Sequence, residues 1–167
     1  MHSTAPLTRV AAAGLALALT SCVGPSAGTL PPEAAHFNVG REHLALEGWD
    51  PVSYFPEGGG EPVEGSESIE TTYRGLIWRF ASEDHREQFV ADPERFEPAY
   101  GGWCAWAMVD GEKVEVDPQS FLIEDGELLL FYDGFWGDTR QMWLDAGPDA
   151  HLRDRANREW ASIRAID

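Results

Sequence analysis

Residues 121–132 read FLIEDGELLLFY, and this stretch decides how the rest of the chain can be arranged. Two apolar runs flank Asp125-Gly126, and an Asp-Gly pair between such runs is typical of a tight β-hairpin. The second run, residues 128–132, is apolar throughout, so both faces of this strand must be covered. We therefore expect a central strand with the other elements packed around it.

The sequence before this hairpin predicts further strands. Apolar side chains alternate in residues 69–73 and again in residues 76–80, with Arg74-Gly75 between the two runs. This pattern favours a hairpin with one buried face. Residues 43–46, His-Leu-Ala-Leu, predict a short additional strand.

Helices are predicted mainly from their capping residues. Asp50 is expected to cap a short helix that starts at Pro51. The longer predicted helices are residues 83–91 after the N-cap Ser82, residues 139–146 before Gly147, and a last helix that begins at Pro148. Together these elements predict an α+β fold, a small single domain in which antiparallel hairpins with about five strands pack against about four helices.

The composition narrows the classes of partner. The chain has 167 residues, with 29 acidic and 12 basic side chains, and a formal net charge of −17. Lys113 is its only lysine. A polyanion needs clustered basic side chains, so we expect no nucleic-acid partner. The hydrophobic fraction of 43% is sufficient for a packed core.

The N-terminal residues predict export and a lipid anchor. Residues 1–21 have the pattern of a signal peptide, with Arg9 before a ten-residue apolar stretch that is too short to span a bilayer. The stretch ends in Leu-Thr-Ser-Cys, which resembles the bacterial lipobox, so Cys22 is the expected lipidation site. Residues 22–36 then form a flexible tether, and residues 37–167 form the domain. We expect it in the cell envelope, anchored by lipid to a bacterial membrane on its periplasmic or extracellular face.

Three sequence blocks resemble YHS domain-containing proteins. Residues 48–55, GWDPVSYF, are similar to the GYDPVAYF opening of that family. Residues 78–82, WRFAS, with the following DPERF at 92–96, resemble its central strand and helix. Residues 100–108, YGGWCAWAM, resemble the YGGYCAYAM block of its exported branch. The resemblance covers about residues 39–160.

This resemblance implies a link to soft metals. YHS domains attached to heavy-metal transport ATPases are associated with metal binding through three cysteines. The aligned positions are Ser53, Ala81 and His85, so the thiolates that soft metals prefer are missing there. The cysteine of the exported branch is matched by Cys104, and some relatives are described as carrying selenocysteine at that position.

Cys104 is therefore the main candidate site residue. If Cys22 is lipidated, Cys104 is the one free thiol, which is a feature to mark in an exported protein. Met108 follows four residues later, so both sulfurs would share one side of a helix and suit Cu(I). His85 is the third candidate ligand. The alternatives are a buried Cys104, a core Met108 and a hydrogen-bonded His85 at the domain boundary.

Four further residues are candidates for lining a pocket near Cys104. They are Asp50, Tyr54, Tyr100 and Trp103. The alternatives are a capping role for the aspartate and core packing for the aromatic residues.

Three functions are compatible with these observations. The first is an envelope lipoprotein whose YHS-like domain binds copper or another soft metal ion near Cys104. The second is a thiol-redox protein that uses Cys104. The third is a non-catalytic structural or adaptor lipoprotein that contacts another, unidentified envelope protein. No nucleophile elbow is present, so the sequence does not support a Ser-His-Asp triad. The unpaired thiol in the motif block favours binding over catalysis without deciding between them, and we expect no nucleotide or organic cofactor.

Overall fold

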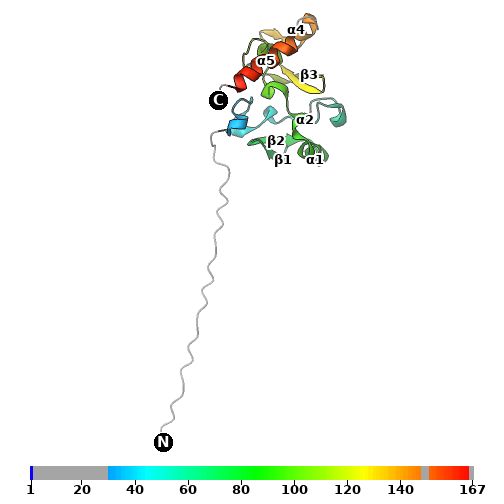
Figure 1. Ribbon diagram of the computed structural model, residues 1–167. Helices are drawn as coiled ribbons and strands as arrows, with labels where there is room; N and C mark the ends of the chain where they lie inside the picture. The colour runs from blue at the N-terminus through cyan, green and yellow to red at the C-terminus, as the bar shows by residue number, and fades with distance from the viewer. Residues whose placement is uncertain (2–29, 148–150, 166–167) are drawn as a thin grey trace.

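The computed structural model describes Met1, residues 30–147 and residues 151–165 (Figure 1). The predicted signal peptide, the lipidation site Cys22, most of the tether and the predicted helix start at Pro148 lie outside these residues. Within the described residues, no helix is both long and apolar enough to cross a membrane.

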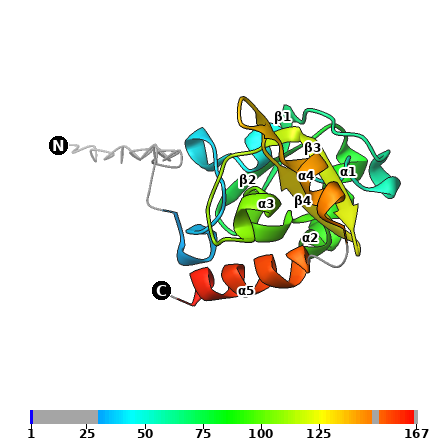
Figure 2. The same ribbon diagram turned by 90° about the horizontal axis from the view of Figure 1, so that it is seen from above.

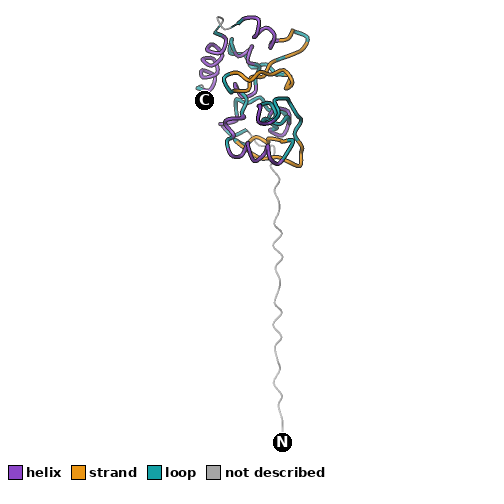
Figure 3. The backbone as a smooth tube through the Cα atoms, turned by 90° about the vertical axis from the view of Figure 1, so that its right-hand side faces the viewer, coloured by secondary structure: helices purple, strands orange, loops and turns teal. Residues whose placement is uncertain are grey.

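The fold is mixed α+β, as expected. The described residues contain three separate antiparallel sheets of two strands each, together with five α-helices and several 3₁₀ turns. The strands are β1 Ser66–Tyr73, β2 Leu76–Phe80, β3 Asp117–Glu124, β4 Glu127–Phe131, β5 Asp133–Gly134 and β6 Gly137–Asp138. The α-helices are α1 Glu83–Ala91, α2 Pro93–Phe96, α3 Ala105–Met108, α4 Thr139–Ala146 and α5 Leu152–Arg164. Figure 3 shows strands at one end of the domain and across its middle.

Strand β4 divides the interior into two apolar clusters. Leu128 and Leu130 belong to the first cluster, whereas Leu129 and Phe131 belong to the second, and all four are fully buried. Alternate side chains of a strand point to opposite faces, so one strand serves both cores. The predicted covered strand is therefore confirmed.

Both edges of β4 also have backbone neighbours. β3 pairs antiparallel with one edge, and isolated parallel bridges join Leu128 to Pro98 and Leu130 to Cys104. The block at 98–104 is thereby held against the central strand.

The first cluster lies between the β1–β2 hairpin and α1. The hairpin turns at Arg74-Gly75 as predicted, and the Ser82 side chain caps α1 by accepting a hydrogen bond from the His85 amide at 3.1 Å. Phe89 of α1 packs on Trp78 of β2, with ring centroids 5.0 Å apart.

The strand predicted at 43–46 is wrong. The 3₁₀ turns Arg41–His43 and Leu46–Gly48 occupy its two ends, and Leu44 and Ala45 form only isolated bridges. His43 and Leu46 have left-handed φ angles of 63° and 50°, which break an extended run.

The short helix predicted at Pro51 is also wrong, although Asp50 does cap this segment. Residues 51–54 form a turn in which Asp50 Oδ1 accepts a hydrogen bond from the Val52 amide at 2.9 Å. Phe55 then adopts an extended conformation before Pro56. A residue before proline avoids the helical region, so the turn does not propagate.

The second cluster is closed by α4 and α5. The structure confirms α4 over Thr139–Ala146, with Gly147 at its end, and the apolar stripe of α5 packs on this cluster. The described part of α5 begins at Leu152 rather than at the predicted Pro148. Figure 2 shows α5 along one side of the domain, next to α3.

Candidate functional site

The Cys104 thiol forms a closed ring of hydrogen bonds with Tyr132 and Thr139. The Tyr132 amide donates to Cys104 Sγ at 3.4 Å, and Thr139 Oγ1 lies 3.4 Å from the same sulfur. The Thr139 hydroxyl donates to the Tyr132 carbonyl at 2.7 Å. Because that proton is already used, the thiol itself donates to Thr139 Oγ1. The sulfur therefore acts as both donor and acceptor.

This ring joins the start of α3 to the β5–β6 hairpin and the start of α4. The Cys104 side chain has no solvent exposure, and its amide donates to the Val114 carbonyl at 3.0 Å. A reactive or metal-binding cysteine needs access and a thiolate. The geometry around Cys104 supplies a buried sulfur whose hydrogen-bonding capacity is used within the fold.

The other two candidate metal ligands have different surroundings. Met108 is fully buried in the second cluster, and its amide donates to the Cys104 carbonyl at 3.0 Å. His85 belongs to α1, beside the first cluster, where its Nδ1 lies 2.6 Å from Asp50 Oδ2. Within the described residues, no group of three or more His, Cys, Asp or Glu side chains is arranged to hold a metal ion.

Asp50 is a buried carboxylate that ties three segments together. Its Oδ1 accepts from the amide of its own turn, and its Oδ2 accepts from the Ala81 amide at 2.7 Å as well as contacting His85. The Ser53 hydroxyl donates to the Asp50 carbonyl at 2.8 Å. The three positions that the YHS resemblance aligns with cysteines thus all contact Asp50.

The predicted pocket residues do not line one common pocket. Tyr100 lines a cleft of about 740 Å³, whereas Tyr54 lines a separate surface pocket of about 500 Å³. Trp103 Nε1 donates to the His36 carbonyl at 2.6 Å, and Asp50 is fully buried.

Both tyrosine hydroxyls have partners. Tyr54 donates to the Pro118 carbonyl and Tyr100 to Asn157 Oδ1, each at 3.0 Å. Burial raises the pKa of both phenols above the ordinary value, so both stay protonated and donate.

The β5–β6 hairpin carries a feature that the sequence reasoning missed. Phe135 and Trp136 at its tip are 90% and 80% exposed, and their rings pack edge to face with centroids 5.0 Å apart. The available signal was their position between Gly134 and Gly137, where a turn presents both side chains.

Hydrogen bonds to Tyr132 fix the base of this hairpin. The Trp136 amide donates to the Tyr132 hydroxyl at 3.3 Å, and the Thr139 amide donates to the Tyr132 carbonyl at 3.1 Å. A Cβ at Gly134 would come within 2.6 Å of the Tyr132 hydroxyl, so a larger residue here would displace the Tyr132 side chain. The exposed pair therefore stands on a base that is hydrogen-bonded to Cys104.

Comparisons of the chain with protein-family models, curated proteins and solved structures find no match. The chemistry of these sites is therefore the basis for a functional assignment.

Proposed function

We propose that the chain is an exported, lipid-anchored adaptor with a YHS-like domain, and that it binds a protein partner through Phe135 and Trp136. The observation that carries this proposal is the exposure of two large aromatic side chains on a hydrogen-bonded hairpin. Aromatic side chains of this kind dominate the binding energy of protein interfaces.

The charge of the molecule favours a protein over a bilayer. Asp133 and Asp138 flank the aromatic pair, and the whole chain carries a formal charge of −17. Anionic headgroups would repel this surface. The partner is therefore a protein with an apolar pocket bordered by basic side chains.

In this proposal Cys104 has a positioning role. Its sulfur accepts from the Tyr132 amide and donates to Thr139, the two residues that flank the hairpin. The motif block 100–108 then serves to fix the hairpin. Metal-holding and thiol-redox functions both require access to the Cys104 sulfur, which its burial opposes.

Site-specific photocrosslinking in the native host tests the proposal. A photoreactive phenylalanine analogue replaces Phe135, and in a matched control it replaces Val90, an exposed apolar residue of α1. We expect a discrete protein adduct from position 135 and none from position 90. The purified partner should bind the Trp136→Ser variant about thirtyfold more weakly or worse, because an aromatic anchor contributes about 2 kcal/mol or more.

Two results would overturn the adaptor function. The first is an adduct to lipid only, which would place the hairpin in a bilayer. The second is equal crosslinking from both positions, which would mean that the exposed pair selects no partner.

A further inference from the structure

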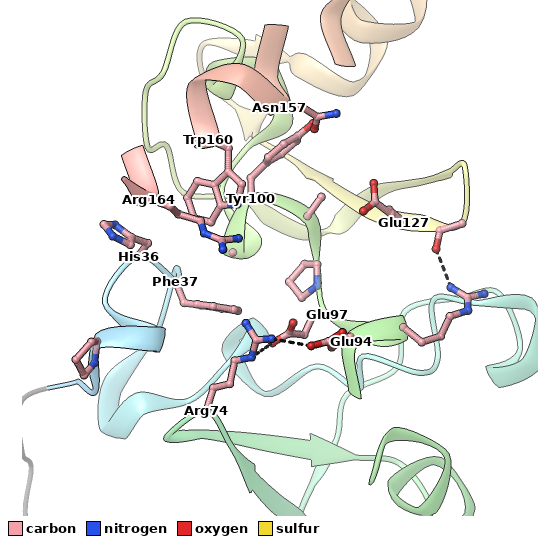
Figure 4. A pocket seen from close by; sticks show the side chains of 16 residues that line it. His36, Phe37, Arg74, Glu94, Glu97, Tyr100, Glu127, Asn157, Trp160 and Arg164 are labelled. Carbon is pink, nitrogen blue, oxygen red and sulfur yellow. Dashed lines mark hydrogen bonds and ion pairs between the residues drawn. The ribbon is translucent and has the colours of Figure 1, made fainter. Parts of the chain in front are cut away.

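A cleft on a different face of the molecule has the properties of a small-molecule site. Its volume of about 740 Å³ falls within the range of about 300–1,000 Å³ found for ligand pockets. Figure 4 shows Trp160 and Arg164 of α5 above the cleft and Arg74 and Glu97 below it. The cleft is independent of the Phe135–Trp136 hairpin.

The base of the cleft is formed by the start of the 100–108 block. Tyr100 has a left-handed φ of 55°, and Gly101 follows with a φ of 61°. A Cβ at Gly101 would lie 3.1 Å from both the Trp160 ring and the Phe37 backbone. Backbone strain in a non-glycine residue is a frequent property of functional sites. The glycine keeps the aromatic walls close to the base.

Most charges in the cleft neutralise one another. Glu94 and Glu97 pair with Arg74 at 3.1 Å and 3.4 Å. Glu127 pairs with Arg153, a residue of α5. The carboxylates of the cleft are therefore engaged and offer little to a cation.

Two further arginines of the cleft differ in the hydrogen bonds and ion pairs that they form. Arg95 donates to the Gly126 carbonyl at 2.7 Å and pairs with Glu57 at 3.1 Å. Arg164, in contrast, forms no hydrogen bond and no ion pair within 4.0 Å with any residue that the structure describes, although its charge acts on Glu97 and lowers the pKa of that carboxyl. The described residues therefore leave the N–H donors of this guanidinium unused, and its fork geometry suits a carboxylate.

Glu97 adds a second polar group. Its Oε1 is buried without a hydrogen-bond partner among the described residues, and the side chain is only 13% exposed. Burial raises the pKa of this carboxyl, which favours the form that donates a hydrogen bond.

Aromatic side chains supply the apolar part of the site. The Trp160 ring packs edge to face on Tyr100 with centroids 6.4 Å apart, and Phe37 lines the opposite side. Figure 4 shows Arg164 on the same side of the cleft as Trp160 and Tyr100. A flat apolar group bound here would have its anionic substituent within reach of Arg164.

We propose that this cleft binds a small aromatic carboxylate, with its carboxylate on Arg164 and its ring between Trp160 and Phe37. A single available guanidinium matches a single carboxylate, whereas a phosphate dianion would need further donors.

Isothermal titration of the purified full chain with 1-naphthoate tests the proposal. Arg164→Gln should weaken binding by about tenfold or more, because it removes a charge-assisted bidentate contact. Arg158→Gln is the matched control, since Arg158 is an exposed residue of the same helix outside the cleft lining, and it should leave the affinity unchanged.

Two further titrations separate this site from other apolar surfaces. The neutral isostere 1-naphthamide should bind about tenfold more weakly than 1-naphthoate. Phe135→Ser should bind 1-naphthoate like the wild type, and this result does not depend on the adaptor function. The proposal is overturned if the wild type gives no binding heat at millimolar 1-naphthoate. Equal affinities of the Arg164→Gln and Arg158→Gln variants, or of the acid and the amide, would also overturn it.

Discussion

The sulfur of Cys104 satisfies one backbone amide and one hydroxyl, which come from residues 28 and 35 positions further along the chain. Cys104→Ala leaves the Tyr132 amide without an acceptor in a buried place. We expect the free energy of unfolding to fall by about 2 kcal/mol, as for other buried unsatisfied donors. Urea denaturation of the two proteins measures this difference.

Cys104→Ser is the control, because a hydroxyl retains both the donor and the acceptor and should cost less. In a chain carrying Cys22→Ser, the Cys104 thiol should also react with a disulfide reagent only after denaturant is added. Rapid reaction in native buffer would contradict the buried ring and revive the thiol-redox function.

The buried carboxylate of Asp50 takes part in three hydrogen bonds. In Asp50→Asn, the amide nitrogen must face a backbone N–H donor, that of Val52 or that of Ala81. We expect a loss of about 2–4 kcal/mol in the free energy of unfolding, because contacts to a buried charged acceptor are lost. Thermal and urea unfolding provide the measurement. Asp84→Asn, on the exposed first turn of α1, should change stability by about 0.5 kcal/mol or less.

Glu97 makes stability depend on pH. Burial raises the pKa of its carboxyl above the ordinary 4.5, and Arg74 offsets this only in part. The folded chain therefore keeps a proton that the unfolded chain has released. Its contribution is fully present below about 4.5 and is lost as pH rises through the folded pKa.

The free energy of unfolding of the wild type, relative to Glu97→Gln, should thus decline as the pH rises above the ordinary carboxyl pKa of 4.5. Denaturant titrations at several pH values give this difference, and the subtraction removes contributions from other groups such as Glu47. A difference that does not change with pH would show that Glu97 titrates normally.

At the scale of elements, β4 is the strand on which both apolar clusters depend. Leu130→Ala removes a fully buried side chain from the first cluster and should cost about 3 kcal/mol, as large-to-small core substitutions do. Leu144→Ala on the exposed face of α4 should cost about 0.5 kcal/mol or less. Urea denaturation distinguishes the two. Equal losses would contradict the dividing role of β4.

The elements that the sequence predicted correctly are specified by local signals. Asp125-Gly126 and Arg74-Gly75 set the two hairpins, and Ser82 and Gly147 mark helix ends. The segment at 43–46 was mispredicted because long-range contacts shape it. The Ala45 amide donates to the Ile77 carbonyl, and left-handed residues on either side bend the chain.

The site residues show the same difference between local sequence signals and long-range contacts. Cys104 and Asp50 were singled out by motif, but their partners Thr139 and His85 lie 35 residues away along the chain. Periodicity and capping report on neighbours within a few residues, so they could not show that Cys104 is enclosed. The sequence analysis gave no role to the exposed pair at the hairpin tip, although the flanking Gly134 and Gly137 are a turn signal.

At the scale of the whole molecule, net charge and the aromatic pair should act on different steps of association. A formal charge of −17 attracts a basic partner over a distance that salt shortens. The association rate constant with the partner should therefore fall by about tenfold or more between about 0.05 M and about 0.5 M salt. The dissociation rate constant should change little, because it depends on the desolvated Phe135 and Trp136.

The double variant Phe135→Ser, Trp136→Ser should change the dissociation rate and leave the salt dependence of association unchanged. Its dissociation should accelerate, while the dependence of its association rate on salt stays that of the wild type, since the net charge is the same. Surface plasmon resonance at several salt concentrations measures both constants. An association rate that does not change with salt would mean that the partner surface carries no basic border. In that case shape and apolar contact alone would select the partner of this acidic protein.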